Sequence, residues 1–388
     1  MNNFCSIFSQ LLQLFPRIEF QQLVKETHAE RHAKGFTCWG QFVAMLFCQL
    51  GRAHSLREIT GGLQSCEGKL KHLGMDTAPP RSTLAYANEH RPYELYEQAF
   101  FQLFERCRVQ AVGKRKFRFK NKLISMDSST IDLCLEMYDW AKFRRTKGAI
   151  KLHLLLDHDG YLPCFAIITE GNVSDVKVAH QFHFDSGTIV VDDRGYNDYT
   201  LFGRWTAEGI YFVTRMKENA LYEVVGESDV PKNRNILKDE MIELRGPKAI
   251  DKCPYPLRRI EVYDPETEGV LVFLTNNLKL GATTIAAIYK ERWQIEIFFK
   301  ALKQNLKIKT FVGTSANAVK IQIWTALIAM LMLRFLQLRS QFNWSLSNLV
   351  ALLRMNLFTH RDLWAWLNKP YETPPIPYEP DQLQFCFI

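Results

Sequence analysis

The chain lacks the cysteine spacing of a structural zinc site. Its nine cysteines are scattered, and no two are spaced as Cys-x-x-Cys. This excludes a zinc ribbon and gives no indication of a disulfide framework. We therefore expect ordinary buried thiols in a reduced, cytoplasmic protein.

Long hydrophobic runs and leader features are also scarce. The N-terminal sequence has neither the basic region nor the small-residue cleavage site of a signal peptide. The most apolar run, 323–333, is too short to span a bilayer and lies between Lys320 and Arg334. There is no internal repeat and no low-complexity tract. These absences predict a protein without membrane contact.

What is present points to a multidomain globular protein. The chain has 388 residues, of which 47% are hydrophobic and 13% aromatic, enough for a packed core. That length predicts two or three structural units. The formal net charge of +8 is compatible with a polyanionic partner.

Residues 1–105 are predicted to be helical, because leucine and phenylalanine recur at helical spacing without strand-like alternation. Ser55 is expected to cap a helix that Gly61 and Gly62 end or kink. A second helix follows a glycine-containing turn, which resembles a helix-turn-helix arrangement; a plain helical bundle is the open alternative. The groove-facing candidates are Arg81, Ser82, Thr83 and Tyr86.

A basic linker, residues 106–122, comes next. It contains no acidic residue, and Phe117 and Phe119 are interleaved with its cations. Several cations can clamp a phosphate backbone, and exposed aromatics can stack on bases. A solvated linker is the alternative. The main candidates for backbone contact are Lys114, Arg115, Lys116, Arg118 and Lys120.

The middle of the chain predicts an α/β unit. A strand from Lys122 carries Asp127, and 149–157 and 162–170 form a hairpin. A helix, a short buried strand ending at Asp192-Asp193, another helix and a strand follow. This order predicts an RNase H-like core with its first part at 123–217.

The rest of the chain completes the predicted organisation. Residues 218–282 contain short strand-like pieces separated by glycine, proline and asparagine, which predicts a β-rich insertion. Residues 283–340 then supply the second part of the core. Residues 341–388 form a helical C-terminal region whose proline-rich tail, 373–380, is expected to lie extended on the surface.

The helix predicted from Tyr289 to Lys309 has two distinct sides. At about 100° per residue, Tyr289, Arg292, Glu296 and Lys303 fall within a sector of about 60°. An apolar seam occupies another side, formed by Ile295, Phe298, Leu302 and Leu306. The polar stripe is either a solvated face with i,i+4 ion pairs or a carboxylate flanked by phosphate-binding groups.

Three carboxylates can meet in this fold. The first and fourth strands of an RNase H-like sheet are neighbours, so Asp127 and Asp193 can converge, and the helix can add Glu296. Three carboxylates suit Mg²⁺, which prefers oxygen ligands and keeps several waters. Two such ions can activate an attacking oxygen and stabilise a leaving one.

These motifs resemble those of the DDE transposases of bacterial insertion sequences, specifically the "insertion sequence four" family. The resemblance covers roughly 127–309 and rests on MDSST around Asp127, VVDDRGY around Asp193, and the pattern Y-x2-R-x3-E-x6-K. The pattern is met by Tyr289, Arg292, Glu296 and Lys303. The resemblance implies that Asp127, Asp193 and Glu296 bind two Mg²⁺ ions, with Mn²⁺ as a substitute. Asp193 is preferred over Asp192 because it precedes Arg-Gly-Tyr, as in the family.

The resemblance further implies double-stranded DNA partners, namely terminal inverted repeats and target DNA. Tyr289, Arg292, Lys300 and Lys303 would hold DNA phosphates, and synapsis would require a homodimer in a nucleoid-associated protein. The alternatives are an RNase H-like nuclease without strand transfer and a catalytically silent, domesticated DNA-binding protein. Some relatives hold a flipped base on a tryptophan in the insertion. The insertion here has none, so a substitute is needed from Tyr222, Tyr255, Tyr263 or Phe273.

Overall fold

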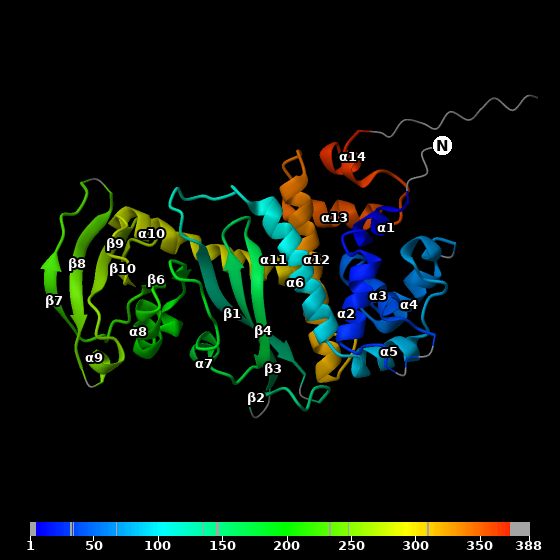
Figure 1. The fold of residues 1–388 in the computed structure, drawn as a ribbon, viewed down its shortest axis with the longest axis horizontal. Helices are drawn as coiled ribbons and strands as arrows, with labels where there is room; N and C mark the ends of the chain where they lie inside the picture. The colour runs from blue at the N-terminus through cyan, green and yellow to red at the C-terminus, as the bar shows by residue number, and fades with distance from the viewer. Residues whose placement is uncertain are drawn as a thin grey trace, which may run out of the picture.

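A mixed sheet of ten strands fills one half of the computed structural model, and a helical bundle fills the other (Figure 1). The structure describes residues 5–372 except 32, 34, 67, 135, 145–146, 233, 247 and 309. The predicted α/β class with a helical N-terminal region is therefore confirmed. The predicted proline-rich tail, 373–380, lies outside the described residues.

The N-terminal helices follow the predicted pattern with two differences. They are α1 (Ile7–Leu12), α2 (Arg17–Glu26), α3 (Cys38–Leu50), α4 (Leu56–Gln64), the 3₁₀ turn η1 (Leu70–Leu73), α5 (Arg81–His90) and α6 (Glu94–Ala111). Ser55 caps α4 by accepting the N–H of Glu58. However, α4 continues through Gly61 and Gly62, and α6 runs into the predicted basic linker, so that residues 106–111 are helical.

All but one of the central strands lie where the sequence predicts them, and the exception is the short strand Lys142–Arg144. They are β1 (Leu123–Leu133), β2 (Lys142–Arg144), β3 (Lys147–Asp157), β4 (Leu162–Glu170), β5 (Ile189–Val191) and β6 (Tyr211–Arg215). β1 pairs antiparallel with β3, and β3 pairs antiparallel with β4. β1 pairs parallel with β5, and β5 pairs parallel with β6. Thus β1 and β5 are neighbours, although more than fifty residues separate them in sequence.

The strands predicted as an insertion continue the same sheet. They are β7 (Tyr222–Glu227), β8 (Ile236–Leu244), β9 (Leu257–Asp264) and β10 (Gly269–Thr275). β10 pairs antiparallel with β6, with Thr275 beside Val213, and β9, β8 and β7 follow outward. This segment therefore extends the central sheet instead of forming a separate sheet (Figure 1).

Helices cover both faces of the sheet. On one face, α7 (Asp175–Ala179), α8 (Tyr199–Ala207) and α9 (Ala249–Lys252) pack with a cluster that includes Val190. On the other face, α10 (Ala282–Glu291) packs with a cluster that includes Val191. Because side chains alternate along a strand, adjacent residues of β5 reach opposite clusters.

One apolar helix forms the centre of the bundle. α12 (Ala316–Arg339) contacts α3, α5 and α6 of the N-terminal region and also β4. By length and composition alone α12 could cross a membrane, but its most apolar window is 89% buried within the protein. It is therefore the core helix that the sequence predicts, although it is longer than the apolar run considered there.

The helix predicted over 289–309 is two helices with a break. α10 ends at Glu291, Arg292 forms a turn, and α11 (Trp293–Asn305) follows, ending before Lys309. Gly281 is the N-cap residue of α10. The break lets α10 pack on the cluster around Val191 while α11 packs on the bundle core. The predicted apolar seam of Ile295, Phe298, Leu302 and Leu306 is buried.

The C-terminal helices pack beside the bundle. α13 (Leu346–Asn356) contacts α3, α11 and α12, and α14 (Leu363–Asn368) follows it. Ser345 and Asp362 cap these two helices with their side chains. The first and last described segments also meet, because Ser6 and His360 form an isolated β-bridge.

Candidate active site

Two adjacent strands bring Asp127 and Asp193 to the same place. In the parallel pair of β1 and β5, Ser125 lies beside Val191. Asp127 and Asp193 each lie two residues further along the chain. Strand alternation therefore turns both toward the face that α10 covers. The N–H of Ser128 donates to Asp127 Oδ1 at 2.7 Å, and that of Gly195 donates to Asp193 Oδ1 at 2.7 Å.

The turn between α10 and α11 brings Glu296 to the same place. Arg292 Nη2 donates to Glu296 Oε1 at 2.6 Å, and Arg292 Nη1 lies 3.8 Å from Asp127 Oδ2. One guanidinium thus bridges the carboxylates of β1 and α11. Tyr289 lies one turn earlier, with its ring centre 5.7 Å from the Arg292 guanidinium carbon.

The electrostatics of Asp127 reflect this crowding. Burial is the main cause that raises the pKa of Asp127 to about 7. The Ser128 N–H and the Arg292 guanidinium lower that pKa, whereas the carboxylates of Asp193 and Glu296 raise it. Asp193 and Glu296 thus both act on the charge of Asp127, in keeping with the contacts that place them near it.

The donor set fits a divalent cation in its chemistry. Three carboxylates supply the hard oxygen ligands that Mg²⁺ prefers, and a bound cation would favour their ionised forms. In the described parts of the chain, no three acidic, histidine or cysteine side chains are already arranged as a metal cage. Instead, Arg292 lies between Asp127 and Glu296.

Asp192 occupies a different environment from Asp193. It is fully buried, and alternation along the strand turns it toward the face of Val190, where α7 and α8 pack. Burial raises the pKa of Asp192 well above its usual range. The structure thus distinguishes Asp192 from Asp193 by the face of the sheet that each side chain meets. The sequence alone distinguishes them only by the family pattern.

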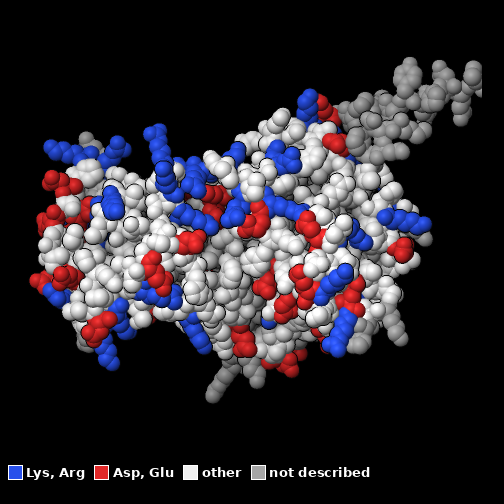
Figure 2. Space-filling view, in the orientation of Figure 1, with Lys and Arg blue, Asp and Glu red and all other residues white. Residues whose placement is uncertain are grey.

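The basic linker is only partly available for an external partner. Arg115 Nε pairs with Asp159 at 2.9 Å, and Lys116 pairs with Glu291. Lys114, Arg118 and Lys120 are exposed, with no ion pair to any described residue. Figure 2 shows lysine and arginine side chains gathered over this segment, at the upper edge of the molecule.

The aromatic residues of the linker differ from the prediction. Phe117 and Phe119 stack on each other, with ring centres 5.0 Å apart, and pack against the cluster below α10. Since both rings are already in contact with protein, they are not the exposed base-stacking surfaces that were expected. Phe273, one of the suggested substitutes for a base-holding tryptophan, is buried with its ring centre 4.6 Å from that of Tyr289.

The remaining predicted DNA contacts lie in different surroundings. Lys300 is exposed on α11, whereas Lys303 Nζ donates to the carbonyl of Thr130 on β1 at 2.9 Å. Arg81 is exposed as the first residue of α5, in the helical half of the molecule (Figure 1). Lys303 therefore also ties α11 to the strand that carries Asp127.

Sequence reasoning missed Glu291. This residue is buried, pairs with Lys116, and accepts the hydroxyl of Tyr161 at 2.9 Å. It therefore joins the basic linker to the turn at Arg292. In sequence it looks like an ordinary surface charge, because its partners lie 175 and 130 residues away.

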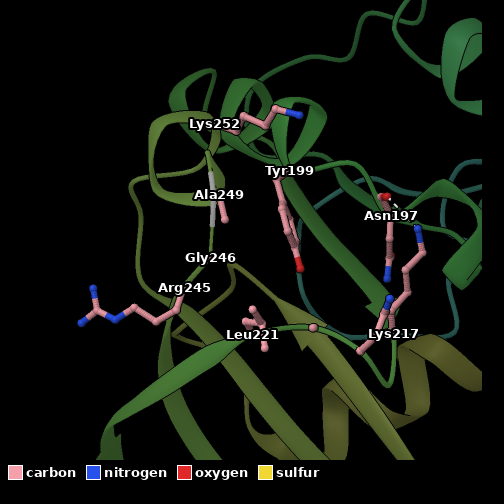
Figure 3. Close-up of a pocket in the computed structure, with 10 residues that line it drawn as sticks. Asn197, Tyr199, Lys217, Leu221, Arg245, Gly246, Ala249 and Lys252 are labelled. Atoms are coloured by element: carbon pink, nitrogen blue, oxygen red, sulfur yellow. Dashed lines mark hydrogen bonds between the residues drawn. The ribbon is translucent and has the colours of Figure 1, made fainter.

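A separate cleft of about 310 Å³ lies near the start of α8. In Figure 3, Tyr199 reaches into this cleft, whereas Arg245 and Lys252 point away from it. None of the three carboxylates described above lines it. The cleft is therefore not the candidate active site.

Comparison with known proteins agrees with this arrangement. Residues 118–332 match the model of the transposase DDE domain, and residues 5–76 match a domain of unknown function, DUF4372. A Sinorhizobium fredii protein named "Putative transposase y4zB" is 32% identical over 80% of this chain and 87% of its own length.

Two further relatives belong to insertion sequences. A Geobacillus stearothermophilus protein named "Probable transposase for insertion sequence element IS5377" is 28% identical over 71% of this chain and 74% of its own length. A Synechocystis protein with a similar name, for element IS4SA, is 26% identical over 66% of this chain and 71% of its own length. The chain therefore belongs to the DDE transposase family and is an insertion-sequence DNA transposase.

Proposed function

We propose that the chain performs cut-and-paste transposition with an RNase H-like core in which Asp127, Asp193 and Glu296 bind two Mg²⁺ ions. The observation that carries this proposal is the position of Arg292 between Asp127 and Glu296, with Asp193 on the neighbouring strand. The strand order β4-β3-β1-β5-β6, antiparallel and then parallel, supports the assignment of the core.

The residues around the carboxylates would position DNA. Arg292 offers a planar guanidinium, and Lys300 and Lys303 add charge along α11, so a phosphate at the transposon end would meet several donors. The Tyr289 ring centre lies 5.7 Å from the Arg292 guanidinium carbon, within reach of a cation–π contact. When bound, two Mg²⁺ ions would activate the attacking oxygen and stabilise the leaving one.

The proposed reaction has two chemical steps at this one site. First, water attacks a phosphodiester at the transposon end, and the bond to the 3′ oxygen breaks, which releases a 3′ hydroxyl. Second, this hydroxyl attacks a phosphodiester of target DNA and displaces the 3′ oxygen of the target strand. No covalent bond between protein and DNA is needed. We propose that the N-terminal helices bind the terminal inverted repeats and that two chains act together in synapsis.

The test is metal-dependent cleavage of duplex DNA that carries the element's own terminal repeat. Asp127→Ala, Asp193→Ala and Glu296→Ala are each expected to reduce cleavage at least about 100-fold, because each removes several kcal/mol of transition-state stabilisation. Asp132→Ala is the matched control, since Asp132 is exposed on the same strand as Asp127. Equal loss in the control, or full activity in the three variants, would contradict the proposed site.

A pre-cleaved transposon end distinguishes transposition from simple nuclease action. With a supercoiled target plasmid and Mg²⁺ or Mn²⁺, we expect joined products that carry the transposon end. Cut DNA without any joined product would instead indicate an RNase H-like nuclease. Absence of both cleavage and joining, with DNA binding intact, would indicate the silent, domesticated alternative.

A further inference from the structure

Lys307, just beyond the end of α11, is buried without an acidic partner. It is 7% exposed and forms no ion pair with any described residue. Its ammonium group contacts Nδ1 of His54, so His54 would carry its proton on Nε2. Lysine is almost never buried to this degree unless an anion compensates its charge. Within the described part of the chain, Lys307 therefore lacks the direct carboxylate contact that such burial usually requires.

The protein core fixes the position of Lys307. Its N–H donates to Gln49 Oε1 at 2.7 Å, and its carbonyl accepts from Gln322 Nε2 at 2.7 Å. Both glutamines are fully buried, one on α3 and one on α12. The lysine is therefore held in place by two core helices, and its burial does not result from a loosely placed surface chain.

Two arginines increase the positive charge. Arg354 Nε on α13 donates to the carbonyl of Leu50 at the end of α3, at 3.3 Å. Burial and then the charge of Arg52 lower the pKa values of both Lys307 and Arg354. Arg52 is exposed, whereas Arg354 is half-buried. Three cations thus converge where α3, α13 and the end of α11 meet.

Nearby negative charge does not balance these cations. Glu58 is a carboxylate that acts on the charge of Lys307, and it accepts the N–H of His54 at 2.9 Å at the start of α4. The carboxyl end of α3 adds roughly half a negative charge. Three cations against these two contributions leave an excess of roughly one and a half positive charges, similar in size to the charge of one phosphodiester.

The backbone at Arg52 gives an independent reason to look for a ligand. Arg52 has φ 59° and follows the end of α3, where the N–H of Ala53 donates to the carbonyl of Cys48 at 3.1 Å. Glycine is the usual residue at this left-handed position, because a side chain there is strained. Arginine at this position is therefore strained relative to glycine, a cost that only its side chain can offset.

The cluster also lies in line with the candidate active site. Lys300 and Lys303 occupy the same face of α11 as Glu296, one and two turns further along. Lys307 is eleven residues beyond Glu296; the helix carries the chain about 14 Å as far as Asn305, and the two residues after it make the distance roughly 14–20 Å. Phosphates along one DNA strand are spaced by about 3.4 Å of helix axis, so this distance corresponds to about five base pairs.

We propose that Arg52, His54, Lys307 and Arg354 bind one backbone phosphate of the transposon-end duplex, about five base pairs from the cleaved phosphodiester. This proposal rests on the proposed function, because it takes Glu296 to mark the cleaved end. The N-terminal helices would then contribute to end binding through the α3–α4 loop, in addition to the helix that Arg81 begins.

The first test compares Arg52→Gly with Arg57→Ala in a fluorescence-anisotropy titration. The probe is a duplex carrying the element's terminal repeat, in EDTA, so that the result does not depend on metal or cleavage. We expect Arg52→Gly to weaken binding about tenfold and to reduce the slope of log affinity against log salt by about one. Arg57, exposed on α4, is the control and should change little. Because glycine suits the backbone at position 52, the melting temperature should not fall.

The second test locates the phosphate. Neutral methylphosphonate linkages are introduced singly at the third to eighth positions from the cleaved end. One of them should weaken binding of the wild-type protein but not of Arg52→Gly. Wild-type affinity and salt dependence in Arg52→Gly would overturn the proposal. The proposal would also be overturned if inorganic phosphate raised the melting temperature of the wild type but not of Arg52→Gly, while the two proteins bound DNA equally. The site would then bind a free phosphate. If the wild type does not cleave DNA but these binding results are obtained, the proposed chemistry is wrong and the phosphate-binding site is supported.

Discussion

Arg292 makes the most consequential contacts of any single side chain in the molecule. Its guanidinium reaches Glu296 on α11 and Asp127 on β1, while the Tyr289 ring lies beside it. These contacts link two carboxylates that are far apart in sequence. They also place a fixed positive charge beside the position proposed for a divalent cation, and like charges repel.

We therefore expect Arg292→Ala to bind Mn²⁺ more tightly than the wild type while losing DNA cleavage. Removing one positive charge a few ångströms from a divalent ion should improve its binding by about 1–2 kcal/mol, or roughly tenfold. Titration followed by electron paramagnetic resonance of free Mn²⁺ measures this directly. Lys300→Ala is the control, because Lys300 is exposed and should alter the affinity less. Weaker Mn²⁺ binding in Arg292→Ala would mean that Arg292 instead helps to assemble the ligands.

Glu291, the neighbour of Arg292, is a buried acid whose negative charge is balanced by hydrogen-bond donors. Burial alone would raise its pKa, but hydrogen bonds from Lys116 and Tyr161 outweigh this, and the pKa of Glu291 is lowered. A carboxyl group with a lowered pKa stabilises the folded state at pH values above its pKa in the unfolded chain. This stabilisation is lost as the pH falls through its pKa in the folded state.

We expect Glu291→Gln to reduce the free energy of unfolding by about 1–3 kcal/mol at pH 7, because it weakens a buried charged network. The difference from the wild type should begin to shrink as the pH falls below about 4.5, the pKa of the carboxyl in the unfolded chain, and should vanish once the pH has fallen through the lower pKa in the folded state. Urea unfolding at several pH values measures it. Glu266→Gln, in an exposed ion pair with Lys290, should have almost no effect at any pH. A loss that is the same at all pH values would show that packing, not charge, is responsible.

At the scale of single elements, α4 contains two glycines in different surroundings. Gly61 faces open space, and no atom lies within 4 Å of an added Cβ. A Cβ at Gly62 would lie 2.8 Å from the ring of Phe47 on α3. The second glycine therefore allows α4 to approach α3, which explains why the helix passes through both residues without ending.

This difference predicts opposite effects from the same substitution. Gly61→Ala should raise the free energy of unfolding by up to about 1 kcal/mol, because alanine favours a helix over glycine. Gly62→Ala should lower it, by about 1–3 kcal/mol, since the ring must move. Thermal or urea unfolding of the two variants provides the measurement, each serving as the other's control. Equal stabilisation by both would show that Phe47 can shift without cost.

At the scale of the whole molecule, the sheet and the bundle share their core. The largest apolar cluster contains residues of the N-terminal helices, β3, β4, α11 and α12. α12 is almost entirely buried, and α3, α5 and α6 cover much of it. The region that matches the DDE domain, 118–332, therefore depends on segments at both ends of the chain for its burial.

We accordingly expect residues 106–388 alone not to form a stable fold, because removal of the N-terminal helices exposes α12 to water. Burial of apolar surface contributes about 25 cal/mol per Å². The free energy lost with a helix-sized interface therefore exceeds the net stability of a typical domain. Circular dichroism, dye binding and size-exclusion chromatography of this fragment test the expectation, with the full chain as control. A monomeric fragment with a cooperative melting transition would contradict it.

The sequence by itself determined the elements and most of their order. Alternation and turn residues closely located the start of β1 and both ends of β3 and β4, because these signals are local. The apolar seam of α11 followed from its period for the same reason. The polar stripe beside it was also recognisable, although the sequence allowed it to be a solvated face.

Only the tertiary structure decided which distant groups meet. The break at Arg292, the continuation of the sheet through β10, the partners of Glu291 and the burial of Phe117 and Phe119 all depend on contacts between residues far apart in the chain. The cluster around Lys307 is the clearest case, since its members come from three separate segments: the α3–α4 loop, the end of α11 and α13. Such contacts leave no periodic signal in sequence, because they are set by the packing of whole elements and not by the preferences of neighbouring residues.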